Sequence, residues 1–600
     1  MKSFNFSHWD LSQKNRGLLF FAQCLEEMLF HYGHDSLKVP ALNFRFLCIE
    51  MVKTIEEIES DTLDRGTLKP LFEELQDSFG KDPVAIALYG NDFPSLFYTK
   101  DVKGEYQRNC SDLLKEPSAE PTIKRIKKTL LYLINDMNIG DKYFSTLKTE
   151  IEKFVNSALF NYDEFNAIYQ LSRVLLTDLI NRSYSKEYIY SIVNGIFYNY
   201  QKRVDNTDVL GVFWNYFNFH EKEYTVQLPL KRRDLKSHLD NFKDVSIVQN
   251  NGGLFDSSCN WIIKTNVSAM DPDQARSTAT ILISFFVSLS QYNNHKSRPF
   301  SADRAIVTTV DTGEVYDSKA PIALLERGVN LDSKQNNEKM ASMVDNFFPI
   351  SELREKLINV VGLHSSAIGA IDISNQLLNL WTIIEILVPT EPKNSFSKIN
   401  QICNILTTIL NSGYVESLMK QLLADLRKCA SETLISDISK IEEGVSDAEK
   451  MAALLVLTKH RDKKIELIDS LDQYPLLQYR MERYIKTLSN RAEVKDFLAA
   501  HKKRLSWQIM RIYRNRNMVV HVGSHFPYID IIVQNLHHYV DSLIDTINIY
   551  AGQGYQSINT IYTAMQQNEY KHILLLELKE KDGTPKDIVN DFVAVVLGVR

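Results

Sequence analysis

Apolar residues recur at three- and four-residue spacing along most of this chain, and this spacing restricts those stretches to amphipathic helices that bury one face. The pattern runs through residues 1–220 and returns at about residue 338. Between 221 and 330 the period changes, and segments such as 224–230 alternate apolar and polar residues as half-buried strands do. The sequence therefore predicts a mainly α protein with a small α+β region in the middle.

The breaks between these patterns divide the 600 residues into four regions. We expect a helical N-terminal sensor or scaffold domain, a small α+β domain, a helical bundle and a C-terminal extension, at 1–220, 221–330, 331–555 and 556–600. The middle region, with a short helix at 236–242 and a hairpin at 305–316, is compatible with a ferredoxin-like arrangement. The extension is predicted to hold a strand at 572–583 and a helix at 587–597. The other helices are expected at 18–30, 44–58, 122–138, 143–159, 162–182, 186–203, 271–291, 340–348, 350–361, 370–388, 397–411, 414–430, 448–457, 463–487, 494–520 and 528–550.

Composition limits the kinds of partner and the location of the protein. A net charge of −6 argues against a generally basic nucleic-acid coat, so any contact with RNA must be local. The six cysteines are scattered, without a Cys-x-x-Cys pair, as expected for reduced core thiols. The first residues contain no apolar signal core, and the most apolar run, 279–289, is too short to cross a bilayer. We therefore expect a cytoplasmic protein without a membrane partner.

The most unusual local feature is a basic helix near the C-terminus. Between residues 502 and 516 it contains no acid. The six basic residues in this stretch are Lys502, Lys503, Arg504, Arg511, Arg514 and Arg516. Arg516 falls within an apolar stripe that includes Ile512 and Val520, and an unpaired buried charge there would cost several kcal/mol. His521 follows, and Gly523 and Pro527 are predicted to end the helix. The pattern places a cation that needs a partner and an imidazole at one helix end.

Arg516-Asn517-x-x-x-His521 resembles the Arg-Asn-x-x-x-His motif of the HEPN superfamily, whose catalytic members are metal-independent RNA endonucleases. The stretch 375–388, with Trp381 and Glu385, resembles the helix that precedes this motif in HEPN domains. The resemblance covers roughly residues 365 to 552, under a third of the chain. It implies a HEPN helical nuclease domain and paired domains that form one composite cleft. Because this chain has one such motif, we expect a homodimer.

The resemblance implies a role for each motif residue. His521 would act as general acid and base toward the ribose 2′-hydroxyl and the leaving 5′-oxygen, which yields a 2′,3′-cyclic phosphate. Arg516 would stabilise the charge on phosphorus, Asn517 would orient the histidine or the phosphate, and Glu385 would hold Arg516. Residues five apart on a helix lie about 140° apart, so either the helix frays near Val520 or two copies combine their motifs.

The flanking residues Lys502, Lys503, Arg504, Arg511, Arg514 and Tyr513 are candidates for an RNA path, although such residues also suit a solvated helix face. Bacterial chains that join a HEPN domain to a large N-terminal region resemble phage-defence effectors, the Apea-like kind among them. The resemblance implies a latent toxin that causes abortive infection after residues 1–330 sense a phage-derived or nucleotide trigger. No cofactor or metal is expected.

Several alternatives remain open from the sequence. A non-catalytic HEPN-like module would bind RNA, a nucleotide or a partner protein, and the Arg516–Glu385 pair would then be a structural ion pair. His521 and His525 have metal-ligand spacing, but Gly523 interrupts the helix between them. Glu577-Leu578-Lys579 resembles the Glu-x-Lys half of the site of metal-dependent nucleases, without a convincing upstream acid.

Overall fold

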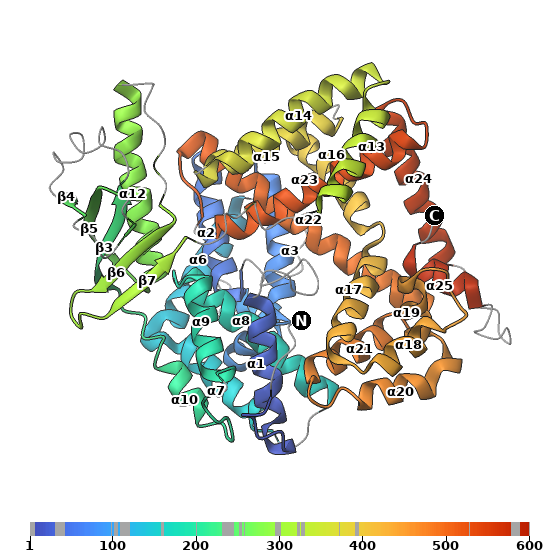
Figure 1. The fold of residues 1–600 in the computed structure, drawn as a ribbon, viewed down its shortest axis with the longest axis horizontal. Helices are drawn as coiled ribbons and strands as arrows, with labels where there is room; N and C mark the ends of the chain where they lie inside the picture. Colours follow the sequence, from blue (N-terminus) through green and yellow to red (C-terminus); the bar gives the residue numbers. More distant parts are fainter. Residues whose placement is uncertain are drawn as a thin grey trace. The chain divides into compact units, whose positions relative to one another are not determined.

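The computed structural model describes residues 6–29, 42–97, 99–100, 106–107, 120–157, 161–199, 201–230, 245–250, 255–256, 259–293, 300, 302–320, 325, 331–370, 372–389, 395–526, 528–577 and 589–598. The chain divides into two compact units, drawn in Figure 1. The helical unit contains Met1–Thr177, Asp205–Thr207 and Gly328–Arg600, and the sheet unit contains Asp178–Val204 and Asp208–Arg327. Among the described residues, no helix combines the length and the apolar character needed to cross a bilayer.

The N-terminal part of the helical unit is built from amphipathic helices with defined starts. The Asn43 side chain accepts a hydrogen bond from the backbone of Phe46, and Asp82 caps the backbone of Val84 and Ala85, as N-cap residues do. The helices are α1 (Arg16–Leu29), α2 (Phe44–Glu59), α3 (Leu68–Phe79), α4 (Pro83–Tyr89), α6 (Glu120–Asn138), α7 (Lys142–Val155) and α8 (Tyr162–Asn181), with short η1 (Gln13–Asn15), η2 (Arg65–Thr67), η3 (Phe93–Phe97) and η4 (Ile139–Asp141) and the antiparallel pair β1 (Thr99–Lys100) and β2 (Tyr106–Gln107).

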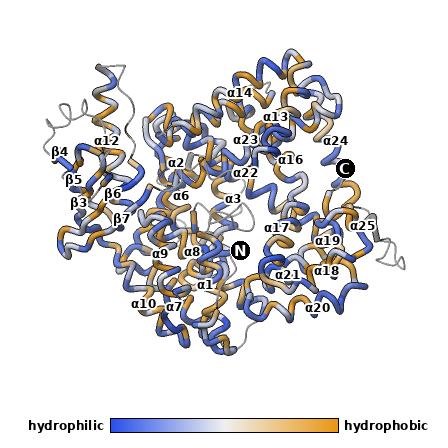
Figure 2. Tube along the Cα trace, viewed as in Figure 1, coloured by the Kyte–Doolittle hydropathy of each residue, from blue (hydrophilic) through white to orange (hydrophobic). Residues whose placement is uncertain are grey.

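The C-terminal part of the helical unit is also helical. Figure 2 shows hydrophobic and hydrophilic residues alternating at short intervals along these helices, which matches the period of amphipathic helices. The elements are α13 (Ser333–Phe347), α14 (Ser351–Gly369), α15 (Ile373–Leu387), α16 (Ser395–Asn411), α17 (Tyr414–Cys429), α18 (Glu432–Ser439), α19 (Asp447–Val456), η6 (Thr458–His460), α20 (Arg461–Asp469), α21 (Pro475–Thr487), α22 (Arg491–Val522), α23 (Ile529–Gly552), α24 (Ile558–Glu577) and α25 (Val589–Leu597).

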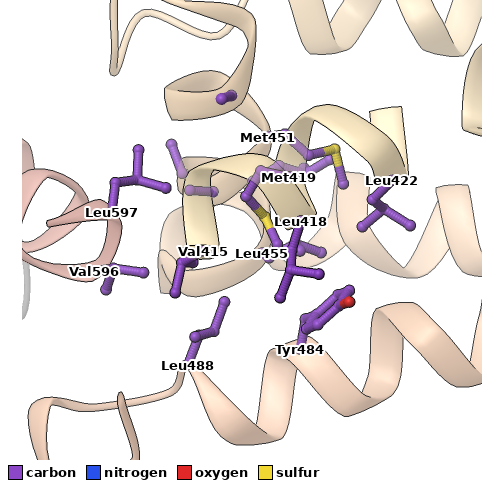
Figure 3. Packing of buried hydrophobic residues seen from close by; sticks show 14 of the residues in the cluster. Val415, Leu418, Met419, Leu422, Met451, Leu455, Tyr484, Leu488, Val596 and Leu597 are labelled. Atoms are coloured by element: carbon purple, nitrogen blue, oxygen red, sulfur yellow. The ribbon is translucent and has the colours of Figure 1, made fainter. Parts of the chain in front are cut away.

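One apolar core of the helical unit lies between α17, α19, α21 and α25. Leu418 of α17 and Leu455 of α19 point toward Tyr484 of α21 in Figure 3, and Val596 and Leu597 of α25 close one side. Burying a side chain of this size contributes about 1.5–3 kcal/mol. The terminal helix is therefore part of the bundle and not a separate extension.

Buried ion pairs join the N-terminal helices to the C-terminal ones within the helical unit. Glu50 of α2 accepts hydrogen bonds from Arg514, at 2.8 Å, and from Arg511, at 3.2 Å, both on α22. Arg511 also contacts Glu74 of α3 at 2.7 Å. The side chains of Glu50, Arg511 and Arg514 are at most 2% exposed. These contacts fix α2 and α3 against the middle of α22.

The sheet unit is a five-stranded antiparallel sheet covered by a long helix. Its strand order is β4-β5-β3-β6-β7, with β5 between β3 and β4 and β3 between β5 and β6. Alternate residues of β3, including Tyr224, Val226 and Leu228, pack beneath Ala279 and Ile283 of α12. The elements are α9 (Lys186–Phe197), α10 (Val209–Trp214), β3 (Lys222–Leu230), β4 (Val245–Gln249), β5 (Trp261–Ala269), α12 (Pro272–Asn293), β6 (Arg304–Thr309) and β7 (Val315–Lys319).

The prediction of a mainly α protein with a small central sheet is confirmed. The order of β3, β4, β5 and β6 agrees with the ferredoxin-like arrangement, whose first helix, expected at 236–242, lies outside the described residues. The division of the chain differs from the expected boundaries, because residues 1–177 share a unit with 328–600, and α9 and α10 belong to the sheet unit.

Individual elements also differ from the predictions. The strand expected from residue 572 is wrong as far as 577, because α24 continues to Glu577. The helix expected at 463–487 is divided into α20 and α21, because Pro475 occupies the first turn of α21. Helices α3, α4, α10 and α18 and the part of α24 before residue 572 were not predicted. Three of them, α4, α10 and α18, have eight residues or fewer and give too short a periodic pattern. Helix 587–597 is present as α25, described from Val589.

We expect Glu50→Gln to lower the free energy of unfolding by about 3–5 kcal/mol, because removing one partner of a buried ion pair leaves the other charge uncompensated. Urea denaturation followed by tryptophan fluorescence measures this change. Glu59→Gln is the matched control on the same helix, because Glu59 is half-exposed and contacts Lys127 at 2.7 Å. Its effect should stay below about 1 kcal/mol. Equal midpoints for the two variants would contradict this role of Glu50.

Candidate active site

Helix α22 carries the motif, and both of its ends are defined by local chemistry. The Asn490 side chain accepts a hydrogen bond from the backbone of Glu493, at 3.0 Å, and caps the N-terminus. The helix continues without a break to Val522 and ends at Gly523, which adopts the left-handed conformation with φ of 69°. The predicted stop at Gly523 is therefore present, while Pro527 lies outside the described residues.

Arg516 lies between two polar partners near the end of α22. Its Nη2 is 3.8 Å from Glu385 Oε2 on α15, and its Nη1 donates to Asn517 Oδ1 at 3.1 Å. Glu385 also accepts a hydrogen bond from Lys398 of α16, at 3.0 Å. The Arg516 and Glu385 side chains are about a quarter exposed, at 27% and 26%. The expected pairing is present, but it is loose and open to solvent, so the guanidinium can still meet an oxyanion.

His521 lies one turn further along α22, and it is exposed. Within the described part of the chain it has no hydrogen-bond partner and no ion pair. Asn517 is mostly buried, and its amide oxygen faces Arg516, so within one chain it orients the guanidinium. No polar contact of His521 therefore stabilises the fold of its own chain within the described residues.

The regular geometry of α22 argues against one of the two explanations offered for the five-residue spacing, a fray or kink near Val520. The helix does not fray or kink before Val522, so Arg516 and His521 remain about 140° apart around its axis. The two side chains therefore do not converge on one face of a single chain.

The prediction that Arg511 and Arg514 line an RNA path is wrong. Both guanidiniums are buried against α2, with exposures of 2% and 1%, and both bind Glu50. Burial by itself raises the pKa of Glu50, but the charges of Arg511 and Arg514 outweigh burial and hold that pKa below its ordinary value. Burial raises the pKa of the neighbouring Glu74 in spite of Arg511. These arginines are structural cations.

The remaining candidates do not form a continuous basic face either. Lys502 contacts Glu569 of α24 at 2.7 Å, and Lys503 lies over the ring of Trp507 at 5.1 Å. Tyr513 is half-buried, with its ring 5.9 Å from that of Trp381 on α15. Of the six residues expected to bind RNA, only Lys503 is exposed.

Arg504 lies in a cavity and not on an open helix face. The cavity has a volume of about 240 Å³ and is also lined by Arg173 of α8 and Arg483 of α21. In the described part of the chain, these three guanidiniums have no carboxylate within ion-pair distance. Burial lowers the pKa of Arg173, and the charges of Arg483 and Arg504 add to this lowering. These three cations therefore share one cavity without a carboxylate at ion-pair distance among the described residues.

The acids that line the same cavity are already engaged. Glu74 contacts Arg511 at 2.7 Å, Asp77 contacts Lys81 at 2.7 Å, and Asp82 accepts hydrogen bonds from the start of α4. Burial raises the pKa of Asp82 to about 6. None of these acids neutralises the arginine cluster.

Sequence reasoning missed Glu50 and Asn515. Glu50 lies on the apolar face of α2, between Leu47 and Thr54, and a carboxylate within such a stripe is a signal for a buried cation. Asn515 is fully buried and accepts a hydrogen bond from the backbone of Phe526 at 3.2 Å, which fixes the chain after the motif. Its signal is weak, because amides are common near helix ends.

Two of the alternative sites are not supported by the geometry. Glu577 ends a helix and contacts Lys495 at 2.7 Å, so Glu577-Leu578-Lys579 does not begin as a strand, and Lys579 lies outside the described residues. His525 Nδ1 lies 3.0 Å from the carbonyl oxygen of Phe526, beyond the end of α22 that carries His521.

No protein-family model, no curated protein and no solved structure matches this chain. The HEPN resemblance therefore depends on the motif on α22 and on the helix that supplies Glu385.

Because Arg514 is buried and Arg516 is partly exposed, replacing each with alanine should change the free energy of unfolding by different amounts. Arg514→Ala should lower the free energy of unfolding by about 3–5 kcal/mol, because it removes a buried partner of Glu50. Arg516→Ala should change it by less than about 1 kcal/mol, because its ion pair is solvent-accessible. Urea denaturation of both variants tests the contrast, and a large loss for Arg516→Ala would identify it as a structural cation.

Proposed function

We propose that the protein is a cytoplasmic HEPN-type RNA endonuclease that acts without a metal at the cleaved bond. The observation that carries this proposal is the position of Arg516, Asn517 and His521 at the end of α22. There the guanidinium is partly exposed, and the imidazole is exposed and has no hydrogen bond or ion pair within the described residues. The other arginines of this stretch are used inside the protein.

The chemistry assigned to these residues follows from their groups. An imidazole can both accept and donate a proton, so that of His521 can serve the 2′-hydroxyl and the 5′-oxygen in turn. The planar guanidinium of Arg516 matches two phosphate oxygens and remains charged throughout. Glu385 lies 3.8 Å from this guanidinium, a distance that leaves Arg516 able to bind phosphate in place of the carboxylate. The product is a 2′,3′-cyclic phosphate and a 5′-hydroxyl.

A homodimer completes the proposed site. The regular α22 separates Arg516 from His521 in one chain, and a second copy would supply the missing group on the facing side. The composite cleft then contains two guanidiniums and two imidazoles around one phosphodiester.

We expect His521→Ala to reduce the rate of RNA cleavage by about 10²–10⁴-fold, because general acid–base help of that size is lost. The rates are measured on total cellular RNA without added Mg²⁺, and sequencing of 5′ ends locates the cuts. His525→Ala is the matched control, an exposed histidine four residues away, and should cleave at the wild-type rate. Wild-type cleavage by the His521→Ala protein would end the proposal, as would a requirement for Mg²⁺.

Mixing the Arg516→Ala and His521→Ala proteins tests the composite cleft separately. A heterodimer keeps one guanidinium and one imidazole on opposite chains, so the mixture should cleave RNA although neither variant does so alone. Absence of recovery, with dimers present by light scattering, would place both groups of each site on one chain.

Regulation by an anionic trigger is supported by the arginine cavity. Arg173, Arg483 and Arg504 line it without a carboxylate of the described residues at ion-pair distance. Phosphate oxygens pair with guanidiniums, so the phosphates of a nucleotide match this part of the lining. Arg504 belongs to α22, the helix that ends at the motif. The same cavity supports the second candidate, a nucleotide-binding HEPN-like protein that does not cleave RNA.

We expect ATP, used as a probe, to raise the thermal unfolding midpoint of the full chain, because ligand at 100 times its Kd stabilises by about 2.7 kcal/mol. Arg504→Gln should weaken ATP binding about 10- to 100-fold through the loss of a charge-assisted hydrogen bond. The variant itself should be no less stable than wild type, since an unpaired cation is removed. Lys495→Gln, which removes an exposed charge from the same helix, is the control. Equal ATP binding by all three proteins would refute an anion site in this cavity.

A further inference from the structure

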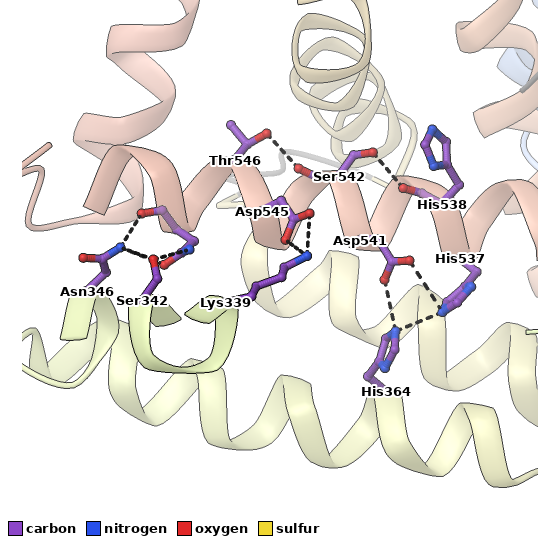
Figure 4. A network of polar contacts seen from close by, with 11 residues as sticks. Lys339, Ser342, Asn346, His364, His537, His538, Asp541, Ser542, Asp545 and Thr546 are labelled. Atoms are coloured by element: carbon purple, nitrogen blue, oxygen red, sulfur yellow. Dashed lines mark hydrogen bonds and ion pairs between the residues drawn. The ribbon is translucent and has the colours of Figure 1, made fainter. Parts of the chain in front are cut away.

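A second polar cluster lies between α14 and α23, outside the proposed RNA site. His364 of α14 places its Nε2 3.0 Å from His537 Nε2 and 3.1 Å from Asp541 Oδ1. His537 Nε2 is 3.8 Å from Asp541 Oδ2. Figure 4 shows the two imidazoles and the carboxylate pointing toward one another. Three possible metal-ligand groups therefore meet at one point.

The local structure explains why these groups converge. His537 and Asp541 are four residues apart on α23, so their side chains lie on one face of that helix. The His364 ring stacks on the His537 ring with centroids 5.0 Å apart. Two ligands thus come from one helix in a fixed register, and the third comes from a neighbouring helix.

Hydrogen bonding alone does not satisfy this cluster. A neutral imidazole has one N–H, and its other nitrogen carries a lone pair. If His364 Nε2 donates to Asp541, the same proton must also serve His537 Nε2. If His537 Nε2 donates to His364, then the lone pair of His364 faces the carboxylate. One cation accepts all three lone pairs at once, which removes this conflict.

The distances and burial agree with a metal site. Ligands held about 2.0–2.2 Å from a metal lie roughly 3.0–3.5 Å apart, and two of the three separations fall in this range. The third needs only a small rotation of Asp541. His537 is buried, at 7% exposure. The Asp541 side chain is one-third exposed, so water can reach the remaining coordination positions.

We propose that His364, His537 and Asp541 bind one divalent transition-metal ion, with water at the open positions. Two imidazoles and one carboxylate form a donor set used for Zn²⁺ and for non-haem Fe²⁺, and the nitrogen ligands disfavour Mg²⁺ and Ca²⁺. The bound ion links α14 to α23, the helix that follows the motif. This proposal does not depend on RNA cleavage, because none of its ligands belongs to the motif.

Zinc binding by the full chain tests the proposal. We expect one Zn²⁺ per wild-type chain by mass spectrometry of the dialysed protein, and competition with a chromogenic chelator gives its affinity. Asp541→Asn and His364→Ala should each weaken Zn²⁺ binding by about 100-fold or more. Asp545→Asn is the matched control, because Asp545 lies one turn further along α23 and contacts Lys339 at 2.7 Å. It should bind Zn²⁺ as wild type does.

The result that overturns the proposal is equal Zn²⁺ affinity in wild type, Asp541→Asn and His364→Ala, or equal thermal stabilisation by Mg²⁺ and Zn²⁺. If a variant does not fold, a measurement on the wild-type protein alone still tests the proposal. Added Co²⁺ should produce visible d–d absorption of nitrogen and oxygen coordination, and Zn²⁺ should abolish it. Failure of Co²⁺ to give this absorption would also reject the site.

Discussion

The helical unit depends on the ion pairs of Glu50, which binds two guanidiniums that have almost no access to water, and Glu74 supplies the second negative charge. Arg511 and Arg514 are three residues apart, so they share one face of α22 and reach the same carboxylate. A buried charge without its partner costs several kcal/mol, which restricts α2 to one register against α22. This constraint explains why the first 177 residues share a unit with the C-terminal helices.

Because the middle of α22 is anchored by these ion pairs, the helix has two kinds of charged group. Some stabilise the fold, and others remain accessible to a ligand. Arg511 and Arg514 are bound by Glu50 and Glu74, and Arg504 lines a cavity, whereas Arg516 and His521 lie in the last turns and are more exposed. A rigid, well-anchored helix that presents a few reactive groups at its end resembles the way many enzymes position catalytic residues. The cavity that contains Arg504 lies on the same helix, so an occupant there and the motif share one rigid element.

The part of the proposed site that could be read from the sequence was the local part. The spacing of Arg516 and His521 and the stop at Gly523 follow from residues within one helix, whereas the pairing of Glu385 with Arg516 was expected from the resemblance to HEPN domains. Whether the other basic residues of α22 are buried or exposed could not be predicted from the sequence. Periodicity identifies one apolar face, but α22 is enclosed on several faces, and a polar face buried against acids looks like a solvated one in sequence.

The sequence by itself determined the helical periods, the alternation of the central strands and the caps of α22, because these depend on neighbours within a few residues. Only the tertiary structure decided which charges are paired and which groups converge. Glu50 meets Arg514 across more than 450 residues, and His364 meets His537 across 173. Such meetings depend on how helices pack, and helix packing follows from the shapes and charges of whole surfaces, which no local pattern encodes.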